Sequence, residues 1–328
     1  MKGVLVGCGY FAGIHLDAWA RLRESVEIIA ACDIDMAAAR RRAGQYGIPR
    51  TYQNYVEMSE TERPDFVDIV TRPDLHGEIA RAAADRNIAV LCQKPIAPTY
   101  EEAEEIVAYC DGRVRFMVNE NWRWQAWYRA VKQVLNSGVI GKPFYFTFRH
   151  RVADGAGPQP YARQPYFVSM PKLLLIETMI HFLDTARFLL GDLRMKSCEM
   201  RRVNPVIQAE DVVVMMLEGE DGLLGVVDGN RLSPPEREGQ VTGDLRIEGD
   251  LGTVSLEGDG RIFVRPVSGA PYEHHYPMPE TGYRGDSAYQ TLKHFVDCMS
   301  SGAEFESSGR DYLKTTRLVF DGYRLAGW

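Results

Sequence analysis

A glycine-rich turn near the start of the chain restricts its fold more than any other feature. The apolar run Gly3–Val6 leads directly into Gly7-Cys8-Gly9-Tyr10-Phe11-Ala12, where a helical pattern begins. In such a strand–turn–helix unit, Gly7 permits the tight turn, Gly9 lets the main chain approach a pyrophosphate, and Ala12 allows close helix–strand packing. The helix N-terminus then faces the phosphates. The turn therefore predicts a dinucleotide-binding βαβ unit, with a tight turn that binds no ligand as the alternative.

An acidic residue at the end of the second apolar run indicates which dinucleotide this unit binds. Asp33 is placed to accept both ribose hydroxyls and to repel a 2′-phosphate, so it favours NAD over NADP. Helix capping is its alternative role. Arg40, Arg41 and Arg42 lie within the next helical pattern, where a solvated basic face is the simplest interpretation. These arginines keep NADP open as the second choice of cofactor.

The order of apolar runs and helical patterns predicts two domains. Over residues 1–118 short apolar runs alternate with helical patterns, which predicts an α/β domain with a doubly wound parallel sheet of the Rossmann type. Over residues 119–328 several strands follow one another after a long helix, which predicts an α+β domain with an open, mainly antiparallel sheet. We expect the first domain to bind the cofactor and the second to bind the substrate, with the C-terminal helix free to pack back on the first.

The expected elements are as follows. The helices cover about Ala12–Arg23, Met36–Tyr46, Leu75–Arg86, Tyr100–Tyr109, Ala126–Ser137, Lys172–Leu190, Ser287–Ser300 and Gly309–Leu325. The strands are Gly3–Val6, Val26–Cys32, Phe66–Thr71, Ala89–Cys92, Val114–Val118, Phe144–Arg149, Lys196–Val203, Asp211–Glu218, Leu223–Gly229, Leu245–Glu248, Thr253–Leu256 and Ile262–Val264.

The composition excludes several classes of function. Of 328 residues 45% are hydrophobic and 25% are charged, and the net charge of −7 comes without a basic cluster. This balance argues against nucleic-acid and membrane-surface partners. No apolar run reaches the ~18–20 residues that a membrane span requires. The six cysteines show neither a CxxC pair nor metal-ligand spacing, so we expect reduced thiols in a cytoplasmic protein and no metal site.

A lysine follows the fourth predicted strand at a position where doubly wound folds bind ligands. Gln93-Lys94-Pro95 lies at the carboxyl edge of the predicted sheet, and Thr71-Arg72-Pro73 with His76 ends the previous strand in the same way. Lys94 lies between the sheet core and a proline, which restricts its access to bulk water. A surface lysine without a chemical role is the equal alternative.

Three titratable residues share one face of the long helix predicted over Lys172–Leu190. Glu177, His181 and Asp184 are spaced i, i+4 and i+7, so they lie on the same side of an α-helix. The flanking residues are strongly apolar, and a histidine with a carboxylate one turn away is suited to act as a general base near neutral pH. A polar stripe on a surface helix is the alternative interpretation.

Together these residues suit the oxidation of an alcohol. Hydride transfer to nicotinamide requires a base for the hydroxyl proton and a cation that stabilises the developing alkoxide. His181 and Lys94 supply these roles, and Glu177 is placed to orient either one. This chemistry needs no metal.

In this order and spacing, the motifs resemble those of the glucose–fructose oxidoreductase/inositol dehydrogenase/MocA-like (Gfo/Idh/MocA) dehydrogenases over essentially the whole chain. The resemblance implies that Lys94 and His181 carry the chemistry and that the second sheet joins subunits into a homodimer or homotetramer. Two residues depart from the family pattern, because Gln93 stands where Glu is usual and Glu177 stands where Asp is usual. The resemblance is carried by Gly7–Ala12, Asp33, Thr71–His76, Lys94-Pro95, Asn121–Trp124, Gly138–Pro143, Glu177, His181 and Asp184.

Within the family the chain is most similar to bacterial aldose dehydrogenases of the D-apiose dehydrogenase type. The segments Asn119–Gln125, Ala162–Phe167, Arg202–Ile207 and Asp228–Arg231 carry this similarity. It implies a cyclic aldose such as a pentose, oxidised at its anomeric carbon to a lactone. The expected NAD contacts are Gly7, Gly9, Tyr10, Phe11, Ala12, Asp33, Thr71, Arg72, His76, Gln93 and Lys94. The expected sugar contacts are Asn121, Trp122, Arg123, Arg163, Tyr166 and Asn230, with ordinary loop or core packing as the alternative for each.

Two other kinds of function remain open. The same scaffold serves inositol or other polyol dehydrogenases, dihydrodiol-type dehydrogenases and NAD-dependent glycosidases, the last of which form no net NADH. A regulatory protein that senses NAD without catalysis is the alternative outside enzymes. Such a protein has no need for Lys94 and His181, so their presence favours a dehydrogenase acting on CH–OH groups.

Overall fold

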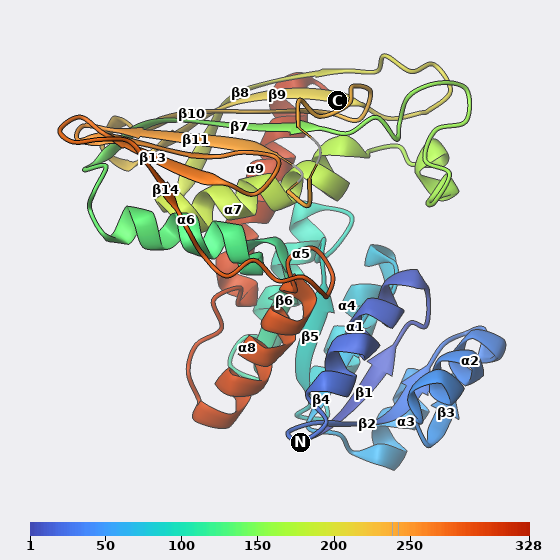
Figure 1. Cartoon of the computed structure of the whole chain (residues 1–328). Coiled ribbons are helices and arrows are strands. Elements are labelled where there is room, and N and C mark those ends of the chain that lie inside the picture. The colour runs from blue at the N-terminus through green and yellow to red at the C-terminus, as the bar shows by residue number, and fades with distance from the viewer. Residues whose placement is uncertain (238, 242) are drawn as a thin grey trace. The chain divides into compact units, whose positions relative to one another are not determined.

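A computed structural model of the chain describes residues 1–237, 239–241 and 243–328, and these form two compact units. The first unit comprises Met1–Asn121 and Asp286–Thr316, and the second comprises Trp122–Gly285 and Arg317–Trp328. Helix α9 (Gly309–Ala326) begins in the first unit and ends in the second. Figure 1 shows the elements of both units along the chain. The assignment of residues 1–118 to the cofactor and 119–328 to the substrate stays a prediction.

The first unit is built on a six-stranded sheet in the order β3-β2-β1-β4-β5-β6, with every neighbouring pair parallel. The strand order reverses between β1 and β4, which in doubly wound folds opens the ligand crevice at the carboxyl ends of the strands. The predicted Rossmann-type sheet is therefore confirmed. Its strands are β1 (Lys2–Val6), β2 (Glu27–Cys32), β3 (Arg50–Tyr52), β4 (Phe66–Ile69), β5 (Ala89–Gln93) and β6 (Phe116–Asn119).

Both faces of this sheet are buried, which explains its sequence pattern. Every residue of β4, β5 and β6 is buried, so these strands do not alternate between apolar and polar residues. Each is mainly apolar and carries one buried polar residue, Asp68, Gln93 or Asn119. The helices of this unit, besides the start of α9, are α1 (Tyr10–Arg21), α2 (Met36–Tyr46), α3 (Tyr55–Glu62), α4 (Pro73–Ala84), α5 (Tyr100–Cys110) and α8 (Ser287–Ser301).

The structure adds two elements that the sequence patterns did not predict in this unit. Strand β3 has three residues, and α3 buries few of its mostly polar side chains. Such short, polar segments carry no usable hydrophobic period. The start of α3 is nevertheless well defined, because the Asn54 side chain accepts hydrogen bonds from the main-chain N–H groups of Val56 and Glu57 in the manner of an N-cap.

The second unit is built on an eight-stranded sheet in the order β14-β13-β12-β11-β7-β10-β9-β8. Strands β7 and β10 are parallel, and the other neighbouring pairs are antiparallel, so the prediction of a mainly antiparallel sheet is confirmed. Its strands are β7 (Pro143–Arg151), β8 (Leu193–Arg201), β9 (Val212–Gly219), β10 (Leu224–Asn230), β11 (Asp244–Gly249), β12 (Gly252–Leu256), β13 (Ile262–Pro266) and β14 (Tyr272–His274).

The two faces of the second sheet differ. Helices α6 (Ala126–Asn136) and α7 (Ile180–Leu190) lie along one face (Figure 1). Buried and exposed residues alternate along β9, as expected for a sheet that is covered on one side. Alternate residues consequently place Val214, Met216 and Leu224 on the other face with 46, 47 and 44% of their surface exposed. The second sheet thus presents an apolar patch on its uncovered side.

The helix predicted over Lys172–Leu190 is present from Leu174 to Leu190, but its first part is not an α-helix. A π-helix covers Leu174–Met179, and the α-helix α7 begins at Ile180. The carboxylate of buried Glu210 accepts hydrogen bonds from the main-chain N–H groups of Leu173 and Leu175 at 3.1 and 2.9 Å. Because these amides bond to a side chain from a distant segment, the chain can start in the wider π geometry, which is rare without such support.

The cysteine side chains lie in the interior of the structure. All six cysteines are buried as free thiols, and burial raises the pKa of Cys8, Cys32 and Cys198 to about 12, so these thiols stay neutral at physiological pH. Within the described ranges, none of the helices combines the length and the apolar character that crossing a bilayer requires.

Candidate active site

The glycine turn of the first unit leaves room for a phosphate group. Gly7 has φ +97°, and a Cβ at this position would lie 2.3 Å from the carbonyl oxygen of Val70, so only glycine fits. A Cβ on Gly9 would meet nothing within 4 Å. Helix α1 starts next to Gly9 without a side-chain cap, and the N-terminus of a helix favours an anion. This open cradle at a helix N-terminus fits the pyrophosphate of NAD.

The carboxylate of Asp33 is held beside this turn. Its Oδ2 accepts a hydrogen bond from the Cys8 main-chain N–H at 2.7 Å, and its Oδ1 accepts one from Asp35 at 2.8 Å. Asp33 is half-buried at the end of β2. This is the position from which a carboxylate recognises the ribose hydroxyls of NAD.

One of the three arginines of α2 also contacts the turn. Arg42 Nη2 donates to the Gly9 carbonyl at 2.7 Å, and its Nε lies 3.4 Å from the Cys8 carbonyl oxygen. Arg40 and Arg41 are exposed. The interpretation of all three as a solvated basic face is therefore wrong for Arg42, because its side chain braces the main chain of the glycine turn.

His76 joins the segments that follow strands β4 and β5. Its Nδ1 lies 3.0 Å from the carbonyl oxygen of Pro95, and its Nε2 lies 3.1 Å from that of Thr71. Burial lowers the pKa of His76, although these carbonyl contacts act in the opposite direction. Among the other predicted cofactor contacts near the two turns, Ala12 is buried, Phe11 and Thr71 are half-buried, and Tyr10 and Arg72 are exposed.

Lys94 lies at the carboxyl end of β5, next to a cis peptide bond with Pro95. Its main-chain N–H donates to Oε1 of Gln93 at 2.8 Å. The Gln93 side chain is buried, and its Nε2 lies 3.2 Å from Nε2 of His15. No sequence pattern marked His15 as a site residue. An aspartate inside the apolar run of β4, Asp68, was the one signal that could have pointed to this buried polar cluster.

In the second unit, His181 lies flat against an indole ring. The rings of Trp122 and His181 are stacked with centroids 4.7 Å apart and an angle of 5° between their planes. His181 is 7% exposed and Trp122 is 5% exposed. Trp122 belongs to the short 3₁₀ helix Trp122–Trp124. The stack therefore restricts rotation of the imidazole ring.

Two of the predicted site residues form a buried ion pair. Arg123 donates to both carboxylate oxygens of Asp184, from Nε at 2.8 Å and from Nη2 at 2.6 Å. The side chains are 4 and 0% exposed. This bidentate pair joins the 3₁₀ helix to α7. The Asp184 carboxylate therefore binds Arg123, and its expected place on a polar helix face with Glu177 and His181 is not its main role.

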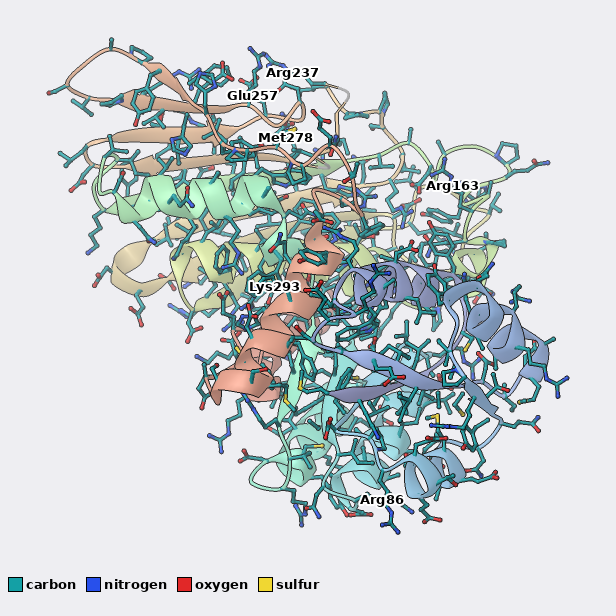
Figure 2. The ribbon with its side chains drawn as sticks, turned by 60° about the horizontal axis from the view of Figure 1, so that its bottom comes forward. Arg86, Arg163, Arg237, Glu257, Met278 and Lys293 are labelled. Carbon is teal, nitrogen blue, oxygen red and sulfur yellow. The ribbon has the colours of Figure 1, made fainter. Side chains whose placement is uncertain are left out.

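Glu177 lies half-buried in the π-helix, close enough to Tyr166 to affect it. Burial first, and then the charge of Glu177, raises the pKa of the Tyr166 hydroxyl. Tyr166 is 57% exposed, and Arg163 is exposed on the same loop (Figure 2). Glu177, Tyr166 and Arg163 therefore give this part of the second unit accessible polar groups.

The last two predicted sugar contacts bond within their own units. The Oδ1 of Asn230 accepts the main-chain N–H groups of Leu232 and Ser233, both at 3.0 Å. Asn121 is buried in the first unit, and its amide donates to Ser287 at 2.9 Å. These bonds define a turn after β10 and the start of α8.

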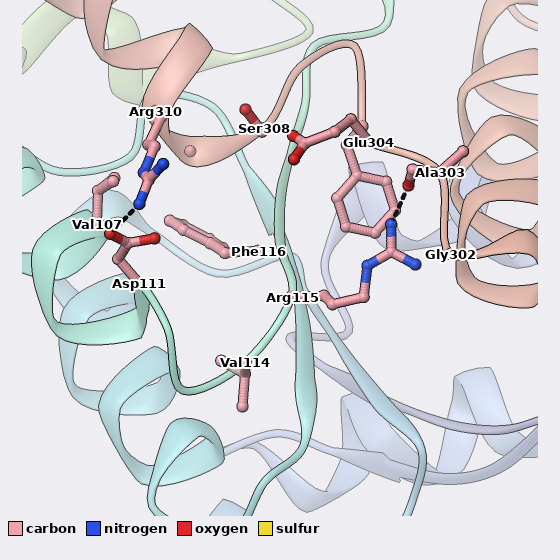
Figure 3. A pocket seen from close by; sticks show the side chains of 12 residues that line it. Val107, Asp111, Val114, Arg115, Phe116, Gly302, Ala303, Glu304, Ser308 and Arg310 are labelled. Atoms are coloured by element: carbon pink, nitrogen blue, oxygen red, sulfur yellow. Dashed lines mark hydrogen bonds and ion pairs between the residues drawn. The ribbon is translucent and has the colours of Figure 1, made fainter.

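A cavity of about 200 Å³ in the first unit lies at the other end of the sheet from the glycine turn. It is lined by the start of β6 and the loop before α9 (Figure 3). Arg115 donates to the carbonyl oxygens of Cys298 and Ala303, and Arg310 pairs with Asp111. These bonds engage Arg115, Arg310 and Asp111, while Glu304 is exposed in the same lining. Within the described ranges, no group of three His, Cys, Asp or Glu side chains could hold a metal ion.

Family models match both parts of the chain. Residues 1–120 match the oxidoreductase family with an NAD-binding Rossmann fold, and residues 128–255 match the GFO/IDH/MocA C-terminal domain. The chain therefore belongs to the Gfo/Idh/MocA family of NAD-binding oxidoreductases. The family, the fold class, the NAD cofactor and the assignment as a dehydrogenase, all predicted from the sequence, are confirmed.

Relatives of this chain include two bacterial sugar dehydrogenases. It is 35% identical to a D-apiose dehydrogenase of Paraburkholderia graminis, over 97% of this chain and 85% of the relative. It is 33% identical to a D-apiose dehydrogenase of Rhizobium rhizogenes, over 99% and 95% of the two chains.

Solved structures agree with this family assignment. An oxidoreductase from Agrobacterium radiobacter, crystallised with NAD⁺, L-tartaric acid and magnesium, superposes with a TM-score of 0.91 at 32% identity, covering 100% of this chain and 96% of that one. A levoglucosan dehydrogenase with NADH and levoglucosan has a TM-score of 0.88 at 18% identity over 100% and 97% of the two chains, a likeness that concerns the fold alone.

Proposed function

We propose that this chain is an NAD-dependent dehydrogenase of a cyclic aldose, a pentose of the D-apiose type, which it oxidises at the anomeric carbon to the lactone. The observation that supports the substrate most is the identity of 35 and 33% to two D-apiose dehydrogenases over nearly the whole chain. The open cradle at Gly9 supports a dinucleotide cofactor, and the carboxylate of Asp33 supports NAD rather than NADP.

In this proposal, the acid–base chemistry is divided between the units. Bound NAD supplies the hydride acceptor. His181 of the second unit takes the proton of the anomeric hydroxyl as its carbon loses hydride, and Lys94 of the first unit stabilises the developing negative charge on that oxygen. Glu177 orients His181 or Lys94. The stack of Trp122 on the imidazole supports the role of His181, because a base must be held in a defined orientation.

The sugar contacts fall into two groups in this proposal. Tyr166 and Arg163 are exposed, so their ring and guanidinium are available to pack on and donate to a sugar, and Trp122 contributes its ring beside His181. Arg123, Asn230 and Asn121 already bond to protein groups. We assign these three to shaping the site rather than to direct recognition of the sugar hydroxyls.

We further propose that the chain forms a homodimer or homotetramer through the uncovered face of its second sheet. Val214, Met216 and Leu224 form an apolar patch on neighbouring strands β9 and β10. A second copy of this chain is the proposed occupant, because symmetric homo-oligomers bury the same surface patch on both subunits. The free thiols support a cytoplasmic location.

A substrate screen tests the proposal. The purified chain, with NAD and separately with NADP, is offered D-apiose, other pentoses, hexoses and inositols while NADH absorbance is recorded. We expect NADH formation with NAD and D-apiose, equimolar with lactone. Turnover of inositols alone would assign the chain to polyol oxidation. Binding of NAD without NADH formation from any of these substrates would contradict a dehydrogenase of sugars or polyols.

A further inference from the structure

A buried chain of hydrogen bonds in the first unit reaches the main-chain N–H of Lys94. Asp68 on β4 lies 2.8 Å from Nδ1 of His15 on α1, and the same carboxylate oxygen accepts the Trp19 indole N–H at 2.8 Å. The other ring nitrogen of His15 lies 3.2 Å from Nε2 of Gln93 and 2.6 Å from Nδ2 of Asn119. His15 and Asp68 have no exposed surface, and Asn119 is 2% exposed.

The partners of His15 determine which of its nitrogens carries the proton. The Oε1 of Gln93 is taken by the main-chain N–H of Lys94, so the amide nitrogen of Gln93 must point toward the ring. An amide nitrogen only donates, and therefore Nε2 of His15 presents its lone pair. The proton then lies on Nδ1, where it is donated to Asp68. The ring is thus the Nδ1–H tautomer.

This order of donors runs in one direction, from the main-chain N–H of Lys94 through Gln93 and His15 to the carboxylate of Asp68. The amide of Gln93 is held at both ends, by the His15 lone pair and by the N–H of Lys94. A glutamate at position 93, the residue that the family pattern favours, has only acceptor oxygens when ionised. It would require a proton on Nε2 of His15 as well, and so a doubly protonated ring. Gln93 and the neutral ring are therefore matched to each other.

We propose that His15 is a positioning residue for Lys94, acting through Gln93 to set the main-chain geometry at the end of β5. This inference rests on the proposed role of Lys94 in the reaction. His15 touches neither NAD nor sugar in this scheme. It supplies the acceptor that keeps the Gln93 amide in the orientation that the Lys94 N–H requires, and a small misplacement of a reacting group costs a large factor in rate.

Two amide substitutions separate positioning from simple packing. His15→Asn places an amide nitrogen where Nδ1 lies, so it keeps the bond to Asp68 and loses the acceptor for Gln93. His15→Gln places an amide oxygen where Nε2 lies, so it keeps the acceptor for Gln93 and loses the donor for Asp68. Each variant removes one of the two hydrogen bonds of the His15 ring, either the bond to Asp68 or the bond to Gln93. Both variants are therefore expected to lower Tm.

The two variants should differ in catalysis. We expect His15→Asn to lower kcat roughly 10- to 100-fold with little change in the KM for sugar, and His15→Gln to retain most of the kcat. Equal kcat values in the two variants, with only Tm lowered, would overturn the proposal and leave His15 a packing residue.

A readout without turnover keeps this inference separate from the proposed function. Hydrogen exchange of the Lys94 amide reports whether its bond to Gln93 persists. We expect faster exchange in His15→Asn than in the wild type and His15→Gln, and equal exchange in all three proteins would contradict the proposal. If the wild type oxidises no sugar, the proposed function fails, while the exchange result still decides whether His15 positions Lys94.

Nitrogen NMR of the histidine ring tests the tautomer itself. The wild type should show His15 with one protonated nitrogen, Nδ1, and Gln93→Glu should show both ring nitrogens protonated. A wild-type ring protonated at Nε2 would overturn the donor order on which the proposal depends.

Discussion

Lys94 in the first unit and His181 in the second are held by different kinds of interaction. Lys94 is fixed through its main-chain N–H, which bonds to Gln93 and from there to His15. His181 is fixed through its ring, which stacks on Trp122, while the buried pair of Arg123 and Asp184 holds the two supporting segments together. The first arrangement is a relay of mostly uncharged groups, and the second depends on buried charge.

This difference indicates how each unit should respond to mutation. A relay of amide and imidazole groups can lose one bond and leave the fold intact, so that the damage is seen in the rate. A buried ion pair that loses one partner leaves an uncompensated charge, which costs about 3–5 kcal/mol. We therefore expect changes around Lys94 to act mainly on catalysis and changes around His181 to act on stability as well.

The largest effect is expected when the positive charge of Lys94 is removed. Lys94→Met keeps the length of the side chain and removes its charge, so we expect kcat to fall roughly 100- to 1,000-fold. NAD binding, measured by fluorescence titration, should be preserved. Unchanged NADH production in this variant would remove Lys94 from the mechanism.

Breaking the buried ion pair between Arg123 and Asp184 should give the largest change in stability. Asp184→Asn leaves Arg123 buried without a full anionic partner, so we expect the free energy of unfolding to fall by about 3–5 kcal/mol. The exposed pair Lys293–Asp297 provides the control, because Asp297→Asn should cost at most about 0.5 kcal/mol. Urea denaturation measures both. Equal losses in the two variants would contradict the account of the second unit.

Glu210 should make the free energy of unfolding of this protein depend on pH. Burial raises the pKa of Glu210 in the folded chain. A carboxyl group whose folded pKa is raised contributes its stability fully below the unfolded pKa, about 4.3, and loses it as pH rises through the folded pKa. The free energy of unfolding of the wild type, minus that of Glu210→Gln, should therefore decrease as pH rises.

The Glu210→Gln variant also tests the support of the π-helix. Gln offers one acceptor oxygen where Leu173 and Leu175 need two, so we expect a loss of roughly 1–3 kcal/mol near neutral pH. Urea denaturation from pH 4.5 to 8 measures both effects. A stability difference that grows with pH would mean that Glu210 is stabilised as the anion.

The smallest effect is expected at the glycine turn. Arg42→Met removes the bond to the Gly9 carbonyl, so we expect the Kd for NAD to rise roughly fivefold, corresponding to about 1 kcal/mol. Arg40→Met is the matched control, because Arg40 is exposed on the same helix. If both variants bound NAD as the wild type does, Arg42 would have no part in shaping the turn.

The local features of this protein were predictable from its sequence, and the long-range ones were not. The turn at Gly7, the carboxylate of Asp33 and the position of Lys94 follow from residues that are neighbours along the chain. The bond between His15 and Asn119 joins residues 104 positions apart, and no local pattern reports such a contact. For the same reason the π-helix was missed, since it depends on Glu210, which lies 35 positions beyond Leu175.

The dependence of rate on pH tests most directly the claim that the second unit supplies the base. The kcat/KM of the wild type should fall at acidic pH as His181 becomes protonated. His181→Ala should lower kcat and flatten this acidic limb, while Lys94→Met should keep the limb at a much lower rate. An acidic limb that is unchanged in His181→Ala would show that another group takes the proton, and would contradict the division of roles between the two units.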